Sequence, residues 1–139
     1  MFEKLWRAFA ASTGALVGFL FGEMDGLVIA LVSLMVIDYA TGIIVGAVEH
    51  KLNSNISFKG LAKKMVILLV VAAANILDTQ VFGGKESIVR SAVCCLYIGN
   101  EGLSVLENAG KLGLPLPKKF KMALEQLKGK DEKEEKEES

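Results

Sequence analysis

Ionisable and amide side chains interrupt long apolar stretches of this sequence. Asp38 stands near the middle of residues 26–48, where every other residue is apolar, small or uncharged. An ionisable group inside a membrane segment is energetically costly, so such groups usually face protein or water and serve a function. Their chemistry would be charge pairing, hydrogen bonding or the lining of a pore. The candidates are Asp38, Thr41, Gly42, Lys64, Asn75, Asp78, Arg90, Glu101, Ser104 and Asn108.

The spacing of these residues places them on one stripe of each predicted helix, because side chains recur on a helix face with a period of 3.6 residues. The three stripes are Leu34, Asp38, Thr41, Gly42 and Glu49; Lys64, Leu68, Val71, Asn75 and Asp78; and Arg90, Cys94, Tyr97, Glu101, Ser104 and Asn108. Helices with one polar stripe and an apolar remainder are expected to turn their polar sides toward one another or toward water.

Two ion pairs are predicted from the depths of these residues. Asp78 and Arg90 would both lie in the outer half of a membrane, on helices joined by a short turn, so we expect them to pair. Lys64, at the inner end of its helix, would reach Glu101. Asp38 would be solvated by a close helix neighbour, by water or by a lysine such as Lys64.

No constellation of residues typical of an enzyme occurs in the sequence. The single histidine, His50, has no second histidine or cysteine near it, and Cys94 and Cys95 are adjacent, which disfavours both a disulfide and a metal site. Ser104 has no base beside it except Glu101, and there is no glycine-rich phosphate loop. We therefore expect no catalysis, no metal and no cofactor.

Four hydrophobic segments position these residues, at about 5–22, 26–48, 65–82 and 86–108. The chain has 139 residues, of which 52% are hydrophobic, and its mean hydropathy is +0.42. A span needs about 20 apolar residues. The predicted fold is an all-α integral membrane protein, with a bundle of three to four transmembrane helices in residues 1–110. In the three-helix alternative the first segment lies at the membrane surface, and a signal peptide is a competing interpretation of the N-terminus.

Basic residues gather in three segments: the N-terminus, residues 49–64 and residues 111–128. Cytoplasmic loops are enriched in lysine and arginine. With four spans all three basic segments fall on one side, which predicts that the N- and C-termini are both cytoplasmic, in a multi-pass protein of the bacterial cytoplasmic membrane.

Residues 111–128 predict a basic amphipathic helix after Pro115 and Pro117, and residues 129–139 predict a disordered charged tail. Such a helix lies on an anionic leaflet or packs against its own membrane domain, and the sequence favours neither alternative. The residues assigned to the membrane surface are Phe120, Leu124 and Leu127 on the apolar face and Lys118 and Lys121 on the basic face.

Glycines recur every four residues in the first two segments. Such spacing lets two helix backbones approach closely within a membrane, and we favour packing over chance, either within one chain or between chains. The predicted packing residues are Gly14, Gly18 and Gly22 in the first segment and Gly42 and Gly46 in the second.

Three short motifs in order carry a family resemblance, over about residues 34–127. They are Asp38, Thr41 and Gly42; then Gly60, Leu61 and Lys64; then Glu101, Ser104, Glu107, Asn108, Pro115 and Pro117. With these motifs the sequence resembles the phage holin family, and within it the toxin-secretion and phage-lysis branch.

The resemblance implies a protein that accumulates as homo-oligomers in the host cytoplasmic membrane. It would then open lesions that release a cell-wall-degrading endolysin, or a toxin, and so lyse the cell. The partners implied are the lipid bilayer and an endolysin that need not touch the protein; no nucleic acid is expected. Two alternatives are a small ion channel or transporter subunit and a non-conducting membrane scaffold.

Overall fold

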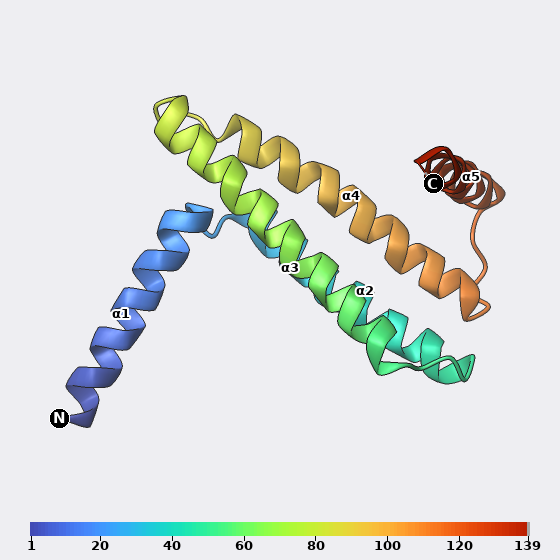
Figure 1. Cartoon of the computed structure of the whole chain (residues 1–139), viewed down its shortest axis with the longest axis horizontal. Helices are drawn as coiled ribbons and strands as arrows, with labels where there is room; N and C mark the ends of the chain where they lie inside the picture. Colours follow the sequence, from blue (N-terminus) through green and yellow to red (C-terminus); the bar gives the residue numbers. More distant parts are fainter. Residues whose placement is uncertain (139) are drawn as a thin grey trace.

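The computed structural model describes residues 1–138, and these residues form five α-helices joined by short turns (Figure 1). No strand occurs in this part of the chain, so the all-α prediction is confirmed. The helices are α1 (Phe2–Phe21), α2 (Gly26–Val48), α3 (Ser54–Ile76), which continues as the π-helical turn η1 (Leu77–Val81), α4 (Ile88–Lys111) and α5 (Lys118–Glu138).

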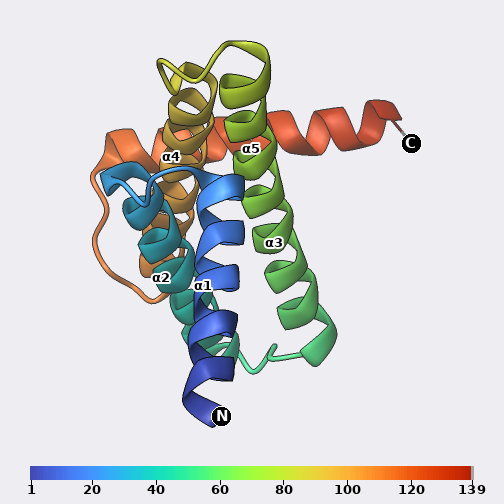
Figure 2. The same ribbon diagram turned by 90° about the vertical axis from the view of Figure 1, so that its left-hand side faces the viewer.

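Helices α2, α3 and α4 form a three-helix bundle (Figures 1 and 2). Helices α2 and α4 run parallel and share the most extensive contact, while α3 runs antiparallel to both. Asp25 caps the N-terminus of α2 by accepting a hydrogen bond from the Val28 N–H, and Asn53 caps α3 in the same way. Because α3 packs against the parallel helices α2 and α4 in the opposite direction, the polar stripes of all three helices face the interior of the bundle.

The apolar core of the bundle is small, and we call it the plug. Its buried members are Val28, Leu31, Met35, Val71 and Cys94. Large apolar side chains outside it are exposed, including Ile29, Val36 and Leu69, which are 54%, 63% and 66% accessible. Extended apolar exposure marks a surface that meets a membrane or another protein.

Two helices among the described residues are long and apolar enough to cross a membrane: Gly26–Val48 and the continuous segment Ser54–Val81. A helix of 23 residues, such as Gly26–Val48, extends about 34 Å at 1.5 Å per residue, which matches the hydrocarbon core. Helices α1 and α4 do not reach the same apolarity; in α4 the polar stripe is the reason. Of the three to four predicted spans, two therefore satisfy length and composition.

Helix α1 leaves the bundle at a steep angle and touches it mainly through α3 (Figure 1). None of its residues is buried. A Cβ built on Gly14 or Gly18 would meet nothing within 4 Å, so the predicted close packing at these two glycines does not occur inside the chain. Packing between chains stays a prediction.

The other three predicted packing glycines meet neighbours within the chain. Gly22 ends α1 with φ 70°, and a Cβ there would lie 2.7 Å from Asn75 Oδ1. A Cβ on Gly46 would lie 3.0 Å from Leu52 Cδ1, and one on Gly42 would lie 3.9 Å from Asn108 Nδ2. The approaches at Gly22 and Gly46 are tight, whereas the one at Gly42 is an ordinary van der Waals contact, and all three involve loops or side chains rather than a second helix backbone.

Helix α5 follows the two prolines and lies crosswise to the bundle axis (Figure 2). It runs to Glu138, through residues for which the sequence predicted disorder from 129 onward. Glutamate and lysine are good helix formers and support one another at i,i+4 spacing, which explains the continuation. Phe120 is 41% exposed. The side chains of Leu124 and Leu127, and Ser139 as a whole, lie outside the described part of the structure.

Candidate functional site

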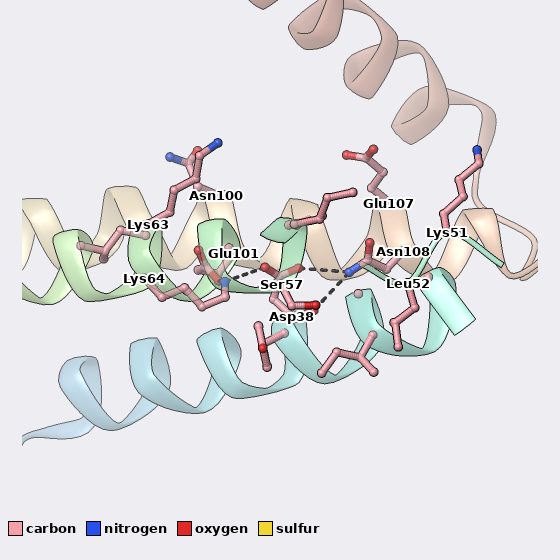
Figure 3. Close-up of a pocket in the computed structure, with 18 of the residues that line it drawn as sticks. Asp38, Lys51, Leu52, Ser57, Lys63, Lys64, Asn100, Glu101, Glu107 and Asn108 are labelled. Carbon is pink, nitrogen blue, oxygen red and sulfur yellow. Dashed lines mark hydrogen bonds and ion pairs between the residues drawn. The ribbon is translucent and has the colours of Figure 1, made fainter. Parts of the chain in front are cut away.

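A lysine between two carboxylates joins all three helices of the bundle (Figure 3). Lys64 Nζ on α3 lies 2.7 Å from Asp38 Oδ2 on α2 and 2.6 Å from Glu101 Oε2 on α4. The three side chains are only 13%, 13% and 8% exposed. The predicted contact of Lys64 with Glu101 is therefore present, and Lys64 is also the partner of Asp38. We call these three residues the charge network.

Asn108 on α4 completes the network on the side of Asp38. Its Nδ2 donates to Asp38 Oδ1 at 3.1 Å and to Thr41 Oγ1 at 2.9 Å. The Thr41 hydroxyl in turn donates to backbone carbonyls one turn earlier, Ile37 O or Asp38 O. Gly42 has no side chain on the side where Asn108 lies. Asp38 and Thr41 thus hold the Asn108 amide against α2, beside Gly42.

A cavity of about 720 Å³ adjoins the charge network between α2, α3 and α4. It lies toward the α2–α3 loop, and its polar wall includes Ser57, Asn100, Ser104 and Asn108. Figure 3 shows Asp38, Lys64 and Glu101 together, whereas Lys51, Lys63 and Glu107 point away from them. The predicted candidate Ser104 therefore lines this cavity.

A second polar cluster lies at the opposite end of the bundle, around Arg90, which is 2% exposed. Its guanidinium binds Asp25 through two bonds, Nη1 to Oδ2 at 2.9 Å and Nη2 to Oδ1 at 3.2 Å. Its Nε donates to Phe21 O at 2.7 Å, and Nη2 also donates to Glu23 O. Arg90 therefore holds the α1–α2 turn onto α4.

The predicted ion pair between Asp78 and Arg90 is wrong. The Asp78 carboxylate instead accepts hydrogen bonds from the backbone N–H groups of Val89 at 3.1 Å and Arg90 at 2.8 Å. It acts as a cap for the N-terminus of α4, where unpaired N–H groups and the helix dipole favour a carboxylate. The Arg90 side chain is then free to reach the α1–α2 turn.

Asn75 belongs to the same end of the bundle. Its Nδ2 donates to Phe19 O at 3.0 Å, which ties the last turn of α1 to α3. The ten predicted polar candidates thus divide into two places. Asp38, Thr41, Gly42, Lys64, Glu101, Ser104 and Asn108 lie in or beside the charge network, and Asn75, Asp78 and Arg90 lie near the α1–α2 turn.

Asp25 belongs to this second cluster, although it was not among the residues predicted from the sequence. The hydrogen bond from Arg90 holds the pKa of this carboxyl below its usual range, against a smaller opposing effect of burial. The available signal was its position directly before a long apolar run, which is typical of a helix N-cap. Its pairing with Arg90 could not be read from that position.

All buried side-chain nitrogen and oxygen atoms in the described part of the structure have hydrogen-bond partners. Over the same residues, no group of three or more His, Cys, Asp or Glu side chains could hold a metal ion. Cys94 is buried in the plug and Cys95 is exposed on α4. Paired charges between helices can hold the helices together. If the helices separate, the same side chains can present polar faces to water.

Comparison with known proteins connects this arrangement to a family. Residues 15–129 match the model of the bacteriophage holin family. The chain is 37% identical over 99 residues to a probable holin of Bacillus phage phi105, covering 71% of each chain. It is 40% identical over 134 residues to an uncharacterized protein of Halalkalibacterium halodurans, covering 94% of this chain and 99% of that one. No solved structure matches the chain.

A clostridial protein is similar over nearly the same region. The chain is 41% identical over 119 residues to an uncharacterized 14.9 kDa protein of Clostridium perfringens, covering 86% of this chain and 89% of that one.

Proposed function

Because the chain belongs to the bacteriophage holin family, we propose that it oligomerises in the bacterial cytoplasmic membrane and opens lesions that release an endolysin, or a toxin. The observation that carries the proposal is the charge network, which pairs Lys64 with Asp38 and Glu101 between helices of the bundle. The chain itself would act without catalysis or cofactor. The endolysin would be a functional partner that need not contact it.

The charge network supports a change between a packed and an open state. Charges inside a membrane are tolerated where they are paired or meet water. In the packed state Lys64 bonds to one residue on each neighbouring helix, so its two ion pairs hold α3 against α2 and α4. If helices rearrange in an oligomer, the same polar stripes would line a water-filled hole.

The membrane potential offers a way to time this change. The network holds two carboxylates and one ammonium, so it carries a net charge when all three are ionised. The potential contributes about 2.3 kcal/mol per elementary charge per 100 mV. Movement of the network across the field would therefore favour one state while the cell is energised and the other when it is depolarised.

We further propose that α2, α3 and α4 span the membrane and that the α2–α3 loop and the C-terminus are cytoplasmic. The N-terminus lies on the same side only if α1 also crosses the membrane, as in the four-span prediction. The two most apolar helices flank the basic α2–α3 loop, which supports a cytoplasmic position for that loop. The crosswise helix α5, with its lysines and with Phe120, supports a position at the membrane surface.

Expression of the chain in bacteria, with and without a cytoplasmic endolysin, tests the function. A holin produces abrupt lysis only when both proteins are present, and addition of an uncoupler advances the onset. An ion channel would change ion permeability without releasing the endolysin, and a scaffold would change neither. Either of these two results contradicts the proposal.

A further inference from the structure

We propose that the cavity between α2, α3 and α4 is a water-filled vestibule that opens at the α2–α3 loop and is sealed at its other end by the plug. The proposal rests on the proposed membrane function and deepens it, because it names the route by which solvent reaches the charge network. Water and small hydrophilic solutes would enter from one face of the membrane only.

The size and the wall of the cavity suit it to hold water. At about 720 Å³ it has room for many water molecules, and its wall offers Ser57, Asn100, Ser104 and Asn108 as hydrogen-bonding partners. A cavity that is both roomy and polar holds water, whereas an apolar one stays dry. Lys64 and Asp38 keep 13% of their side-chain surface accessible, so the charge network forms part of the floor of the vestibule rather than a dry core.

The vestibule would open at the α2–α3 loop. Helices α2 and α3 share far less contact with each other than either shares with α4, and the cavity lies between them near their loop. The cavity wall includes Lys51, Leu52 and Asn53 of that loop. Leu52 lies against Gly46 at this end of the cavity, which we take as its mouth.

The plug would seal the other end of the vestibule. Met35 precedes Asp38 by three residues on α2, Cys94 precedes Glu101 by seven on α4, and Val71 follows Lys64 by seven on α3. Because α3 runs opposite to α2 and α4, all three displacements point to the same end of the bundle. Leu31, Val71 and Cys94 are at most 1% exposed. An apolar constriction of this kind excludes water and can gate a pore by dewetting.

The arrangement places the charge network at the boundary between water and the plug. The transmembrane potential would then fall mainly across the plug, instead of evenly across the bilayer. Separation of the plug residues, rather than of the charge network alone, would complete an aqueous path.

Cysteine accessibility tests the vestibule without any need for lysis. In a chain whose native cysteines are replaced (Cys94→Ala, Cys95→Ala), Ser104→Cys places one thiol in the cavity wall. Right-side-out and inside-out membrane vesicles are treated with a membrane-impermeant cationic methanethiosulfonate, and the remaining thiol is counted with a maleimide mass tag. Asn55→Cys marks the loop face and Lys85→Cys marks the opposite face.

The expected result is labelling of Ser104→Cys from the loop face only. Ile37→Cys is the matched control, because Ile37 lies on α2 next to Asp38 and is 45% exposed on the outside of the bundle. Its thiol should react at least about tenfold more slowly, since a thiolate does not form in hydrocarbon. The single variant Cys95→Ala leaves native Cys94 as the only thiol, and the plug should protect it from both faces.

Three outcomes overturn the vestibule. Labelling of Ser104→Cys from neither face means that lipid or protein fills the cavity, and labelling from both faces means that no seal exists. Rapid labelling of Cys94 means that the plug does not exclude water. Should Ser104→Cys fail to insert in the membrane, Ser57→Cys, nearer the mouth, must show the same one-sided labelling. A chain that labels as expected but releases no endolysin would leave the vestibule standing and contradict the proposed function.

Discussion

Lys64 on α3 and Asp38 on α2 lie 2.7 Å apart, and the same ammonium reaches Glu101 on α4 at 2.6 Å. One cation thus bridges three helices between two acids that would otherwise repel each other. The three side chains are nearly buried, so the loss of one partner would leave an uncompensated charge inside the protein.

Replacement of Lys64 by methionine should be strongly destabilising. It leaves two nearly buried carboxylates without their cation, and the loss of one partner of a buried pair typically costs about 3–5 kcal/mol. The measurement is unfolding of the detergent-solubilised protein by denaturant, together with the time of lysis. Lys64→Arg, which keeps the charge, should retain most of the stability. A wild-type unfolding midpoint for Lys64→Met would contradict the bridging role.

Asp38→Asn should affect the protein more than Glu101→Gln. Glu101 meets Lys64 alone, so a glutamine can turn its oxygen toward the ammonium. The two carboxylate oxygens of Asp38 accept hydrogen bonds from Lys64 and Asn108. An asparagine there would replace one of these oxygens with an NH₂ group, which would face another hydrogen-bond donor. We expect a loss of about 1–3 kcal/mol for Asp38→Asn, from an unsatisfied buried group, and less for Glu101→Gln.

The same two variants test the function through lysis timing in the presence of an endolysin. Asp38→Asn should shift the time of lysis further than Glu101→Gln does. If Asp38→Asn lysed cells at the wild-type time, the charge at position 38 would be dispensable.

The Asp25–Arg90 pair should make stability depend on pH in the acid range. The pKa of Asp25 is lowered in the folded protein, chiefly by the hydrogen bond from Arg90. Its contribution is therefore complete above the unfolded value, about 3.9, and is lost as pH falls through the lower folded value. The exposed part of Asp25 keeps the effect modest.

Thermal unfolding of the wild type and of Asp25→Asn measures this contribution. The difference in Tm should be constant above about pH 5 and should shrink below about pH 4, because the carboxyl is protonated first in the unfolded chain and, at still lower pH, in the folded protein. Lys85→Met, which changes an exposed charge in the α3–α4 turn, serves as the control. A difference that grows as pH falls would contradict the assigned pair.

Gly22→Ala and Gly18→Ala should differ sharply, although both glycines belong to the same predicted repeat. At Gly22 the φ of 70° and the 2.7 Å approach to Asn75 make any Cβ unfavourable, so we expect a loss of about 1–2 kcal/mol. Gly18 faces open space, and alanine there should be neutral or slightly stabilising.

Crosslinking in membranes tests the remaining role of that repeat. If Gly14 and Gly18 pack between chains, Gly18→Leu should lower the yield of oligomers without changing the unfolding of the monomer in detergent. Unchanged crosslinking would remove this face from the assembly.

Residue spacing alone was enough to predict much of the site. The period of 3.6 residues placed Asp38, Thr41 and Gly42 on one stripe of α2, and Glu101 with Asn108 on one stripe of α4, because helix geometry is local. The cost of an unpaired charge in an apolar segment predicted that these stripes would meet, and the Lys64–Glu101 contact followed from depth. The helical fold, the α1–α2 turn and the helix after the prolines were also readable from the sequence.

Only the tertiary structure decided which partner each charge takes. Arg90 and Asp78 are close along the chain, but Asp78 is occupied by the N–H groups that begin α4, so the Arg90 side chain turns to Asp25, 65 positions earlier. Likewise the path of α1 away from the bundle, the cavity beside Lys64 and the plug depend on how the helices pack against one another. These features come from packing between distant segments, which no local period encodes, whereas the stripes that made such packing possible are written in the sequence itself.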